Sequence, residues 1–445
     1  MILPPYVRSC IDALETAGYS AYAVGGCVRD HLLGLEPHDF DLCTDARPEQ
    51  MCQVFQKYDL VLAGLKHGTV GVIFPEGVVE ITTYRTEGGY TDSRHPDWVR
   101  FVDRIEDDLA RRDFTVNAMA WSPTRGLKDP FGGAEDLKLG ILRTVGNPED
   151  RFREDALRIL RGTRFAAKYR LHPEKQTYAA MLRLAPLMDE LARERVFSEL
   201  CKLIMSSDTE DLLRYEPVIT QVIPELAPAV GFDQHSRYHA YDLYTHIAHV
   251  TASVPGELSL RWAALLHDVG KPATFTRDHQ GVGHFYGHAQ AGAKLANDIL
   301  RRLKAPTALR EQVVELIELH MTPVPAQRNV VRRRLSHFGP ERLELLLRLQ
   351  EADLSSKGTG VPSQTEAEHF QQVRSLMAQL LEEEACFSLR DLAVNGHDLI
   401  QLGIPSGKAL GSCLQSLLDA VMDETLPNEK EALLEAAKGF LDCRK

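Results

Sequence analysis

The 445-residue sequence predicts an α+β fold, in which a mixed head of strands and helices precedes a long all-helical remainder. Up to about residue 145, short runs rich in β-branched and aromatic residues alternate with helical stretches. From about residue 150 onward, apolar residues recur at i, i+3 and i+4, the period of an amphipathic helix. The length exceeds what one hydrophobic core usually organises, so we expect several domains.

The individual elements follow from these two patterns. Four runs in the head have the composition of strands and end at Gly, Pro or charged residues: AYAVG, DFDLCT, TVGVIF and VVEITTY. Five later runs are predicted helices: EDALRILRGTRFAAKY, RVFSELCKLIM, LRWAALLHDVG, AQAGAKLANDILRRL and LREQVVELIELH. A polar stretch at 353–368 predicts a linker before a helical tail.

Composition is typical of a soluble globular protein, with 44% hydrophobic and 26% charged residues. The net charge of -12 argues against a protein that coats nucleic acid through bulk positive charge. The stretch 143–202 is different, because it carries 13 Lys and Arg against 9 Asp and Glu. We therefore expect an anionic partner to bind there.

The N-terminus and the cysteines indicate the compartment. Pro4 and Pro5 stand where a signal peptide would be apolar, and no run is long enough to span a bilayer. The eight cysteines show no C-x-x-C pair and no regular spacing. We expect a cytoplasmic protein with reduced thiols and no membrane partner.

Two aspartates are the first candidate catalytic residues. Asp39 and Asp41 lie two apart in a predicted strand, so both should point to one face while Phe40 and Leu42 face the core. Paired carboxylates can hold Mg²⁺ ions for phosphoryl transfer. Taken alone, the pair also fits an ordinary solvated strand face.

A glycine turn strengthens the catalytic interpretation. Gly25 and Gly26 end a strand and open a helix, where backbone can approach a triphosphate closely. Arg29 can add a forked phosphate contact. Glu80, on another predicted strand, is either a third carboxylate ligand or a solvent-facing residue.

Five motifs occur in the order GG-x-VRD, D-x-D, RRDFTVNAMA (111–120), EDALRILR (154–161) and RERVFSEL (193–200). This series resembles the class II tRNA nucleotidyltransferase and bacterial poly(A) polymerase family over nearly the whole chain. The resemblance implies a polymerase-β-like nucleotidyltransferase head at 1–147, a helical neck at 148–226, an HD-type body at 227–360 and a helical tail for tRNA at 361–445. It also implies Mg²⁺ at Asp39 and Asp41.

The resemblance implies nucleotide binding by the RRDFT segment, with Arg111, Arg112, Asp113 and Asn117 contacting phosphate and ribose. Arginine supplies donors for phosphate and aspartate accepts from a ribose hydroxyl. A charge cluster at the end of a helix is the alternative.

Asp155 and Arg158 are expected to read the base. Three residues apart on a predicted helix, they would present an acceptor beside a donor. Cytosine and adenine offer an amino group next to a ring acceptor, which this pair matches, whereas uracil and guanine do not. The resemblance implies the same role and adds Arg161 to the nucleotide site. An ion pair within the helix is the alternative.

The segment 86–99, TEGGYTDSRHPDWV, resembles the family's flexible loop. Its Asp92 and Arg94 are polar groups that the loop could bring over the site. In this family the loop distinguishes enzymes that add C, C and A from relatives that add only the two cytidines. An ordinary surface loop is the alternative.

Eight of the 17 histidines fall between 235 and 288. With the motif HDVGKP, the ordered series resembles an HD metal-dependent phosphohydrolase. The implied ligands are His246, His267, Asp268, His288, His320 and Asp353. Imidazole with carboxylate suits a transition metal such as Mn²⁺, Ni²⁺, Co²⁺ or Fe²⁺. Lys271 either contacts substrate phosphate or caps a helix, and His284 is a neighbour.

The expected reaction is addition of C, C and A to tRNA 3′ ends from CTP and ATP. Poly(A) polymerase is the alternative in the same fold, although its relatives often carry a basic extension that this acidic chain lacks. An HD phosphohydrolase with a degenerate head is a second alternative, and a non-catalytic RNA-binding scaffold a third. The basic segment RNVVRRRL at 328–335 is either a phosphate contact or an exposed helix. The sequence does not indicate an oligomeric state.

Overall fold

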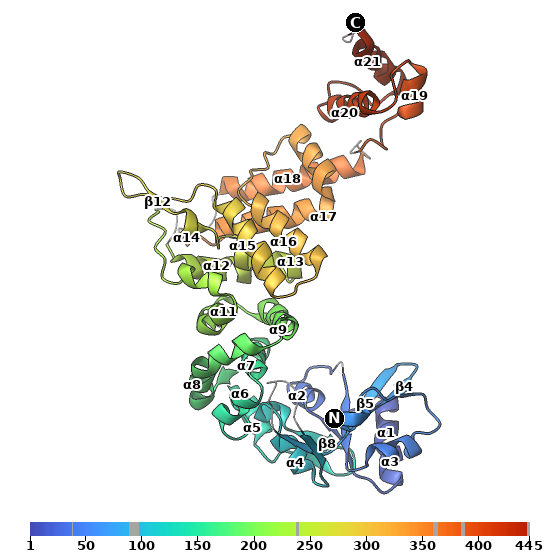
Figure 1. Cartoon of the computed structure of the whole chain (residues 1–445), viewed down its shortest axis with the longest axis vertical. Coiled ribbons are helices and arrows are strands. Elements are labelled where there is room, and N and C mark those ends of the chain that lie inside the picture. The colour runs from blue at the N-terminus through green and yellow to red at the C-terminus, as the bar shows by residue number, and fades with distance from the viewer. Residues whose placement is uncertain (38, 89–97, 237–239, 359–363, 384–387, 443–445) are drawn as a thin grey trace. The chain divides into compact units, whose positions relative to one another are not determined.

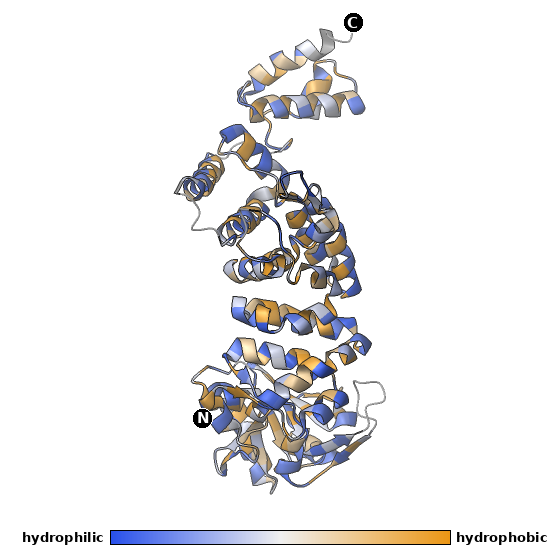
Figure 2. Cartoon of the chain, turned by 90° about the vertical axis from the view of Figure 1, so that its left-hand side faces the viewer, coloured by the Kyte–Doolittle hydropathy of each residue, from blue (hydrophilic) through white to orange (hydrophobic). Residues whose placement is uncertain are grey.

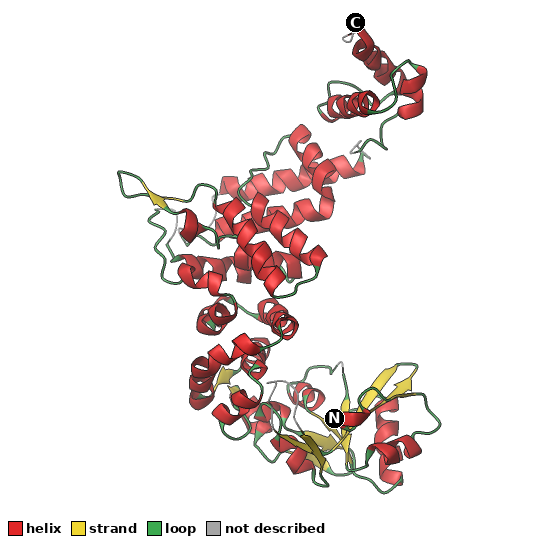
Figure 3. Ribbon diagram, in the orientation of Figure 1, coloured by secondary structure: helices red, strands yellow, loops and turns green. Residues whose placement is uncertain are grey.

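The computed structural model describes residues 1–37, 39–88, 98–236, 240–358, 364–383 and 388–442. The chain divides into two compact units (Figure 1). The first contains residues 1–227 and 299–305, and the second contains residues 228–298 and 306–445. Strands gather in the first unit, and helices make up almost all of the rest (Figure 3). The predicted α+β class is confirmed.

A mixed sheet forms the centre of the head. Its strands lie in the order β3 (Leu60–Val61), β4 (Thr69–Phe74), β5 (Gly77–Thr83), β2 (Asp41–Thr44), β1 (Ala21–Val24), β8 (Ala120–Ser122) and β9 (Gly126–Lys128). β2 and β5 run parallel, and the other neighbours are antiparallel. Two-stranded pairs are formed by β6 (Arg85–Gly88) with β7 (Trp98–Phe101) and by β10 (Ile141–Leu142) with β11 (His172–Pro173).

The two faces of this sheet differ. Leu42 and Ile81 are register partners that point to a buried face, whereas Asp41 and Glu80, one residue earlier, are exposed on the other. Next to these carboxylates the second face is covered, because Tyr22 and Cys43 pack there with Ile105 and Leu109. The two carboxylates are therefore exposed on a sheet face of which the neighbouring part is buried.

In the first unit, α1 to α4 alternate along the chain with the strands of the sheet, and α5 to α11 follow its last strand. These helices are α1 (Pro5–Thr16), α2 (Gly26–Leu32), α3 (Pro48–Val54), α4 (Ile105–Ala110), α5 (Gly133–Leu139), α6 (Pro148–Glu154), α7 (Leu157–Tyr169), α8 (Lys175–Leu184), α9 (Arg193–Ser206), α10 (Thr209–Arg214) and α11 (Glu216–Val222). Short 3₁₀ turns occur at Leu65–His67, Thr115–Asn117, Ala185–Glu190 and Pro224–Ala229.

Two predictions in the first unit need correction. Asp39 precedes β2, which begins at Asp41, so the two aspartates are not both strand residues. The predicted helix EDALRILRGTRFAAKY is broken, because Asp155 adopts an extended conformation (φ -148°, ψ 104°) between α6 and α7. Its carboxylate accepts a hydrogen bond from the Leu157 amide at 3.0 Å, which favours a new helix start over continuation of α6.

The second unit is a helical array. Its elements are α12 (Leu243–Ser253), α13 (Leu258–Leu266), α14 (Lys271–Thr274), the hairpin β12 (Thr276–Arg277) with β13 (Gly283–His284), α15 (His288–Arg302, whose last residues belong to the first unit), α16 (Thr307–Leu319), α17 (Arg328–Ser355), α18 (Gln364–Glu382), α19 (Gly396–Gln401), α20 (Lys408–Met422) and α21 (Lys430–Asp442). Hydrophobic and hydrophilic residues alternate along these helices, as expected for packed amphipathic helices (Figure 2).

The predicted linker at 353–368 is shorter than expected. α17 extends through Ser355, and α18 begins at Gln364 and packs against α17. The last three helices have a core of their own, built around Leu399, Cys413, Leu418 and Leu433. The predicted boundary at 361 thus assigns α18 to the tail although it packs on α17, and the division into four domains remains a prediction.

Candidate functional site

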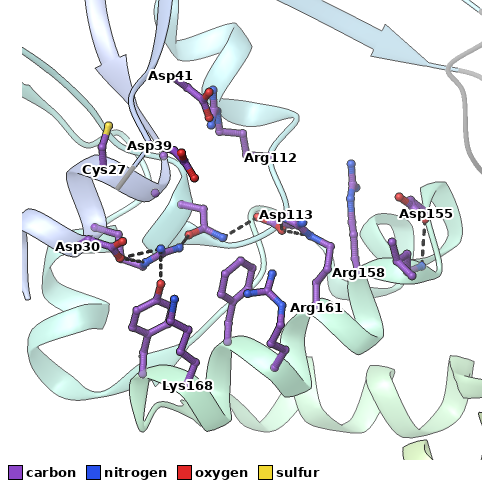
Figure 4. Close-up of a pocket in the computed structure, with 18 of the residues that line it drawn as sticks. Cys27, Asp30, Asp39, Asp41, Arg112, Asp113, Asp155, Arg158, Arg161 and Lys168 are labelled. Atoms are coloured by element: carbon purple, nitrogen blue, oxygen red, sulfur yellow. Dashed lines mark hydrogen bonds and ion pairs between the residues drawn. The ribbon is translucent and has the colours of Figure 1, made fainter. Parts of the chain in front are cut away.

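A polar cavity of about 650 Å³ lies in the first unit (Figure 4). All twelve residues predicted to be catalytic or to bind nucleotide line it: Gly25, Gly26, Arg29, Asp39, Asp41, Arg111, Arg112, Asp113, Asn117, Asp155, Arg158 and Arg161. Nine further residues complete the lining: Cys27, Asp30, Glu87, Leu157, Arg164, Phe165, Lys168, Tyr169 and Arg195. Arg164, Phe165 and Lys168 continue the helix of Arg158 and Arg161, so helical spacing could have identified them.

The glycine turn requires a residue without a side chain. Gly25 has φ +69°, and a Cβ built there would lie 2.7 Å from Nη1 of Arg112 and 3.5 Å from the carbonyl oxygen of Asn117. Its amide donates to the carbonyl of Met119 at 3.0 Å, which holds the turn beside β8. Backbone therefore forms this part of the cavity wall.

The two aspartates reach the cavity from the end of the sheet. Partial burial in the cavity raises the pKa of Asp41, Arg112 opposes this effect, and Glu80 and Asp39 add to it. Glu80 is the register partner of Asp41 but does not line the cavity. An acidic pair that repels itself beside an arginine fits a divalent cation, which would relieve the repulsion.

A hydrogen-bonded network joins the RRDFT segment to the glycine turn. Arg29 donates through Nη1 to the amide oxygen of Asn117 at 2.5 Å, and Nδ2 of Asn117 donates to Asp113 at 3.0 Å. Arg161 then donates to the other carboxylate oxygen of Asp113 at 2.7 Å. Burial would raise the pKa of Asp113, but Arg161 outweighs it and the pKa falls to about 2. Asp113 is therefore a fixed anion at neutral pH.

A residue that the sequence analysis did not identify anchors the two arginines of this segment. Asp108, within α4, is fully buried and accepts from Arg111 at 2.9 Å and from Arg112 at 3.4 Å. Burial would raise the pKa of Asp108, but the two arginines lower it below its ordinary value. Asp108 thus fixes the direction in which Arg111 and Arg112 enter the cavity.

The two residues expected to read the base are brought together differently from the prediction. They do not share one helix, because Asp155 lies in the break before α7 and Arg158 lies in its first turn. The alternative of an ion pair between them is also wrong. Asp155 accepts from Nη2 of Arg195 at 2.8 Å, and Arg158 pairs with Glu154 at 2.5 Å.

One face of α7 is covered by cations around an aromatic ring. The guanidinium carbons of Arg29, Arg161 and Arg164 lie 5.2, 5.3 and 4.0 Å from the centre of the Phe165 ring. Arg164 is buried and pairs with Glu199 of α9 at 2.5 Å. α9 carries the RERVFSEL motif, which supports the cavity wall through Glu199 and contributes Arg195 to its lining.

The predicted flexible-loop residues Asp92 and Arg94 lie outside the described residues. The chain on either side forms the antiparallel pair β6 and β7. Glu87 in β6 pairs with Arg111 at 3.4 Å, so this pair of strands borders the cavity.

A second site lies in the second unit. All six predicted ligands come together in two groups that share Asp268. The first group is His246, His267, Asp268 and Asp353, and the second is Asp268, His288 and His320. Within each group the candidate ligand atoms lie within 4.8 Å of one another. These residues come from α12, the turn after α13, the start of α15, the end of α16, and α17.

The four histidines present the same nitrogen to this cluster. Each Nδ1 faces a backbone carbonyl: His246 that of Ser356 at 3.2 Å, His267 that of Ala264 at 2.8 Å, His288 that of Phe285 at 2.7 Å and His320 that of Ile317 at 2.6 Å. Protonation of Nδ1 leaves each Nε2 as a lone-pair donor toward the cluster. This is the arrangement of metal-binding histidines.

The carboxylates lie among these nitrogens. Nε2 of His246 is 3.0 Å from Asp353, and Nε2 of His267 is 3.2 Å from Asp268. Burial would raise the pKa of Asp268, but His267 and Lys271 keep it well below its ordinary value. Burial lowers the pKa of His320 to about 4, so its imidazole is neutral at pH 7. Nitrogen and oxygen donors in this combination fit a transition metal.

The neighbours of the cluster are also placed. Lys271 is buried and donates to Asp268 at 2.7 Å and to the amide oxygen of Gln234 at 2.9 Å, so it is not only a helix cap. His284 pairs with Asp278 at 2.9 Å and belongs to neither group, as expected of a neighbour.

Three arginines of the segment RNVVRRRL form ion pairs with residues at the end of α20 and just after it. Arg328 and Arg332 pair with Glu424 at 2.6 and 2.9 Å, and Arg333 pairs with Asp423. Arg332 is buried and also donates to the carbonyl of Val421 at 2.9 Å. Both alternatives considered from the sequence, a phosphate contact and an exposed helix, are wrong for Arg332.

Two further expectations concern the whole chain. The six cysteines among the described residues form no disulfide bonds. No described helix combines the length and the apolar character needed to cross a membrane.

Comparison with protein families matches three parts of the chain. Residues 21–143 match the family described as "Poly A polymerase head domain", residues 170–230 match "Probable RNA and SrmB- binding site of polymerase A", and residues 274–437 match "tRNA nucleotidyltransferase domain 2".

Similar proteins match over nearly the full length. A CCA-adding enzyme of Latilactobacillus sakei is 33% identical over 434 residues, which is 96% of each chain. A CCA-adding enzyme of Streptococcus sanguinis is 32% identical and covers 95% of this chain and 94% of its own. The crystal structure of the Bacillus stearothermophilus CCA-adding enzyme in complex with CTP has a TM-score of 0.71 at 28% identity, covering 100% of this chain and 99% of the other. A Thermotoga maritima CCA-adding enzyme complexed with tRNA shares the fold, with a TM-score of 0.58 at 21% identity, covering 99% and 96%.

Proposed function

The chain belongs to the CCA-adding enzyme family of tRNA nucleotidyltransferases, and we propose that it adds C, C and A to tRNA 3′ ends from CTP and ATP. The observation that carries the proposal is the meeting of all twelve predicted residues at one cavity. Acidic residues for phosphoryl transfer and an acceptor–donor set for base recognition thereby border the same space.

The reaction joins the terminal ribose hydroxyl of the tRNA to the α-phosphorus of the nucleotide and releases pyrophosphate. Asp39 and Asp41 would hold two Mg²⁺ ions, which neutralise phosphate charge and favour the ionised hydroxyl. Arg29 and Arg112 line the same cavity and supply donors for phosphate oxygens. Asp108 and Asn117 fix these arginines before the nucleotide arrives, because each is already hydrogen-bonded to one of them.

Base selection is assigned to Asp155 and Arg158. An ionised carboxylate accepts about four hydrogen bonds, and the described contacts of Asp155 use two, from Arg195 and from the Leu157 amide. Arg158 has five donor hydrogens, and contacts with Glu154 and with the carbonyls of Arg151 and Arg111 use three. The remaining acceptor and donor capacity matches the amino group and ring nitrogen of cytosine and adenine.

Poly(A) polymerase remains the alternative for the head. The test uses purified protein and a tRNA that ends before the CCA sequence, offered each labelled nucleotide singly and together. CTP alone should extend the tRNA by two residues, and CTP with ATP by three. Repeated addition from ATP alone, without use of CTP, would identify a poly(A) polymerase instead.

The histidine cluster favours a second activity. We propose that the six ligands of the second unit hold a transition metal and that this site hydrolyses phosphate esters. The metal would supply an activated water molecule and polarise the phosphate. Lys271, at 2.7 Å from Asp268, would place a positive charge beside the phosphate. Hydrolysis of a 2′,3′-cyclic phosphate with added Ni²⁺, Co²⁺ or Mn²⁺, compared with Mg²⁺, tests this proposal.

A further inference from the structure

The cationic side chains that line the cavity of the first unit differ in whether they have a carboxylate partner. They are seven arginines and one lysine. Each arginine lies 3.4 Å or less from a carboxylate: Arg29 with Asp30, Arg111 and Arg112 with Asp108, Arg158 with Glu154, Arg161 with Asp113, Arg164 with Glu199, and Arg195 with Asp155. Their charges are therefore largely neutralised before any substrate binds.

Lys168 is the exception among the described residues that line the cavity. It is exposed near the end of α7, and no carboxylate of the described chain lies within ion-pair distance of its Nζ. It follows Arg161 by seven residues, so it lies on the same face of the helix two turns later. Lys168 thus offers the cavity a full positive charge.

A second cation stands beside it. Nζ of Lys168 and the guanidinium carbon of Arg29 lie 5.1 and 4.1 Å from the centre of the same ring, that of Tyr169. The Tyr169 hydroxyl accepts a hydrogen bond from Nη2 of Arg29 at 2.5 Å, which fixes the ring. Figure 4 shows Lys168 on the side of the cavity where Asp30 lies, away from Asp155. Asp30 compensates the charge of Arg29 at 2.7 Å, so Lys168 is the cation at this ring that has no carboxylate partner among the described residues.

We propose that Lys168 binds a phosphate group of a substrate in this cavity, with Arg29 and Tyr169 holding it in position. This inference rests on the proposed function for the identity of the substrates. The base-reading residues lie at the start of α7 and Lys168 near its end, so a nucleotide lying along the helix places its triphosphate near Lys168. The 3′-terminal phosphate of the tRNA is the other source of the same chemistry.

The test compares Lys168→Gln, which removes the charge and keeps most of the length, with Lys168→Arg, which keeps the charge. The control is Lys175→Gln, an exposed lysine at the start of α8 that does not line the cavity. Loss of a partly solvated charged hydrogen bond should raise the KM for CTP or for tRNA about 5-fold to 20-fold. Lys168→Arg should restore most of it, and Lys175→Gln should change neither.

Separate titrations distinguish the two sources. A higher KM for CTP at saturating tRNA assigns the contact to the triphosphate, and a higher KM for tRNA alone assigns it to the primer phosphate. Calorimetry with inorganic tripolyphosphate gives a readout independent of nucleotide addition, so it also tests the triphosphate contact if the enzyme makes another product. If both KM values and the tripolyphosphate affinity of a folded Lys168→Gln variant stay within 2-fold of the wild type, the proposal is overturned.

Discussion

Asp41 in β2 lies directly opposite Glu80 in the parallel strand β5. Paired residues of neighbouring strands project to the same face, so the two carboxylates are neighbours, although only Asp41 lines the cavity. Burial raises the pKa of Asp41, and the negative charge of Glu80 contributes to this rise. Substitution of Asp39 or Asp41, which line the cavity, should therefore have a larger effect than substitution of Glu80, which does not.

Asp39→Asn or Asp41→Asn should abolish nucleotide addition and leave tRNA affinity within about 2-fold, because ligands of the catalytic metal are removed and not the RNA contacts. Glu80→Gln is the matched control, because it removes a charge next to Asp41 but changes no residue that lines the cavity. It should only raise the Mg²⁺ concentration needed for half-maximal rate. Magnesium titrations of the three variants check this, and full turnover by either aspartate variant would reject the assignment.

Asp155→Ala should weaken base selection. An unmet hydrogen bond in a closed site costs about 1 to 3 kcal/mol, so discrimination against UTP and GTP should fall roughly 5-fold to 150-fold. Competition assays with mixed nucleotides measure the ratio. Arg195→Lys should give a smaller loss in the same direction, because its Nη2 holds the Asp155 carboxylate at 2.8 Å. Unchanged selectivity in both variants would mean that this corner does not read the base.

The pair of Asp113 with Arg161 predicts a pH dependence of stability. The folded-state pKa of Asp113, about 2, lies below its ordinary value of 3.8. Because the carboxyl pKa is lower in the folded state, ionised Asp113 adds to the free energy of unfolding at pH values above the unfolded pKa. This contribution disappears as the pH falls from about 4 to about 2. Asp113→Asn should therefore cost on the order of 2 kcal/mol at pH 7 and at pH 5, and less at pH 3.

Urea unfolding of both proteins at these three pH values measures the difference. An equal cost of the substitution at pH 7 and pH 3 would show that Asp113 stabilises the fold by its shape and not by its charge.

The two proposed metal sites should be independent. His267→Ala combined with Asp268→Ala removes ligands from both groups, so the transition metal should be lost, together with cyclic phosphate hydrolysis. Addition of C and A with Mg²⁺ should persist, because Asp39 and Asp41 belong to the other unit. Elemental analysis of the purified proteins and the two activity assays provide the measurements.

His249→Ala is the control for this double substitution, because His249 lies on α12 with His246 but belongs to neither ligand group. It should keep its metal. Loss of nucleotide addition in a folded double variant would contradict the assignment of two separate sites.

The packing of α17 against α20 should depend on Arg332. Arg332 is buried and donates to a carbonyl at the end of α20 as well as to Glu424. Arg332→Ala should therefore destabilise the protein by about 1 to 3 kcal/mol. The neighbouring Arg333→Ala removes an exposed pair with Asp423 and should cost less than about 1 kcal/mol. Limited proteolysis and thermal melts compare the variants, and equal effects would reject the distinction.

The sequence by itself determined the class of fold, and it predicted twelve of the residues that line the cavity and the six candidate metal ligands. Strand composition and helical period depend on neighbours within about ten residues, so they can be read without coordinates. The predicted runs for β1, β2, β4 and β5 are all strands in the structure, although β2 begins only at Asp41. The six candidate metal ligands were also identified from the sequence, through the resemblance of an ordered series.

Only the tertiary structure decided how these residues meet. At the break before α7, Asp155 makes a local hydrogen bond to the Leu157 amide, but its second carboxylate oxygen is held by Arg195, forty residues away, which helical period does not reveal. The burial of Asp108, which accepts from the Arg85 amide, and of Arg332 against α20 depends on packing between segments that are distant in the sequence. Helical period shows which face a residue occupies but not what lies opposite it. The partner of each charge, and therefore the uncompensated charge of Lys168, is decided by the fold.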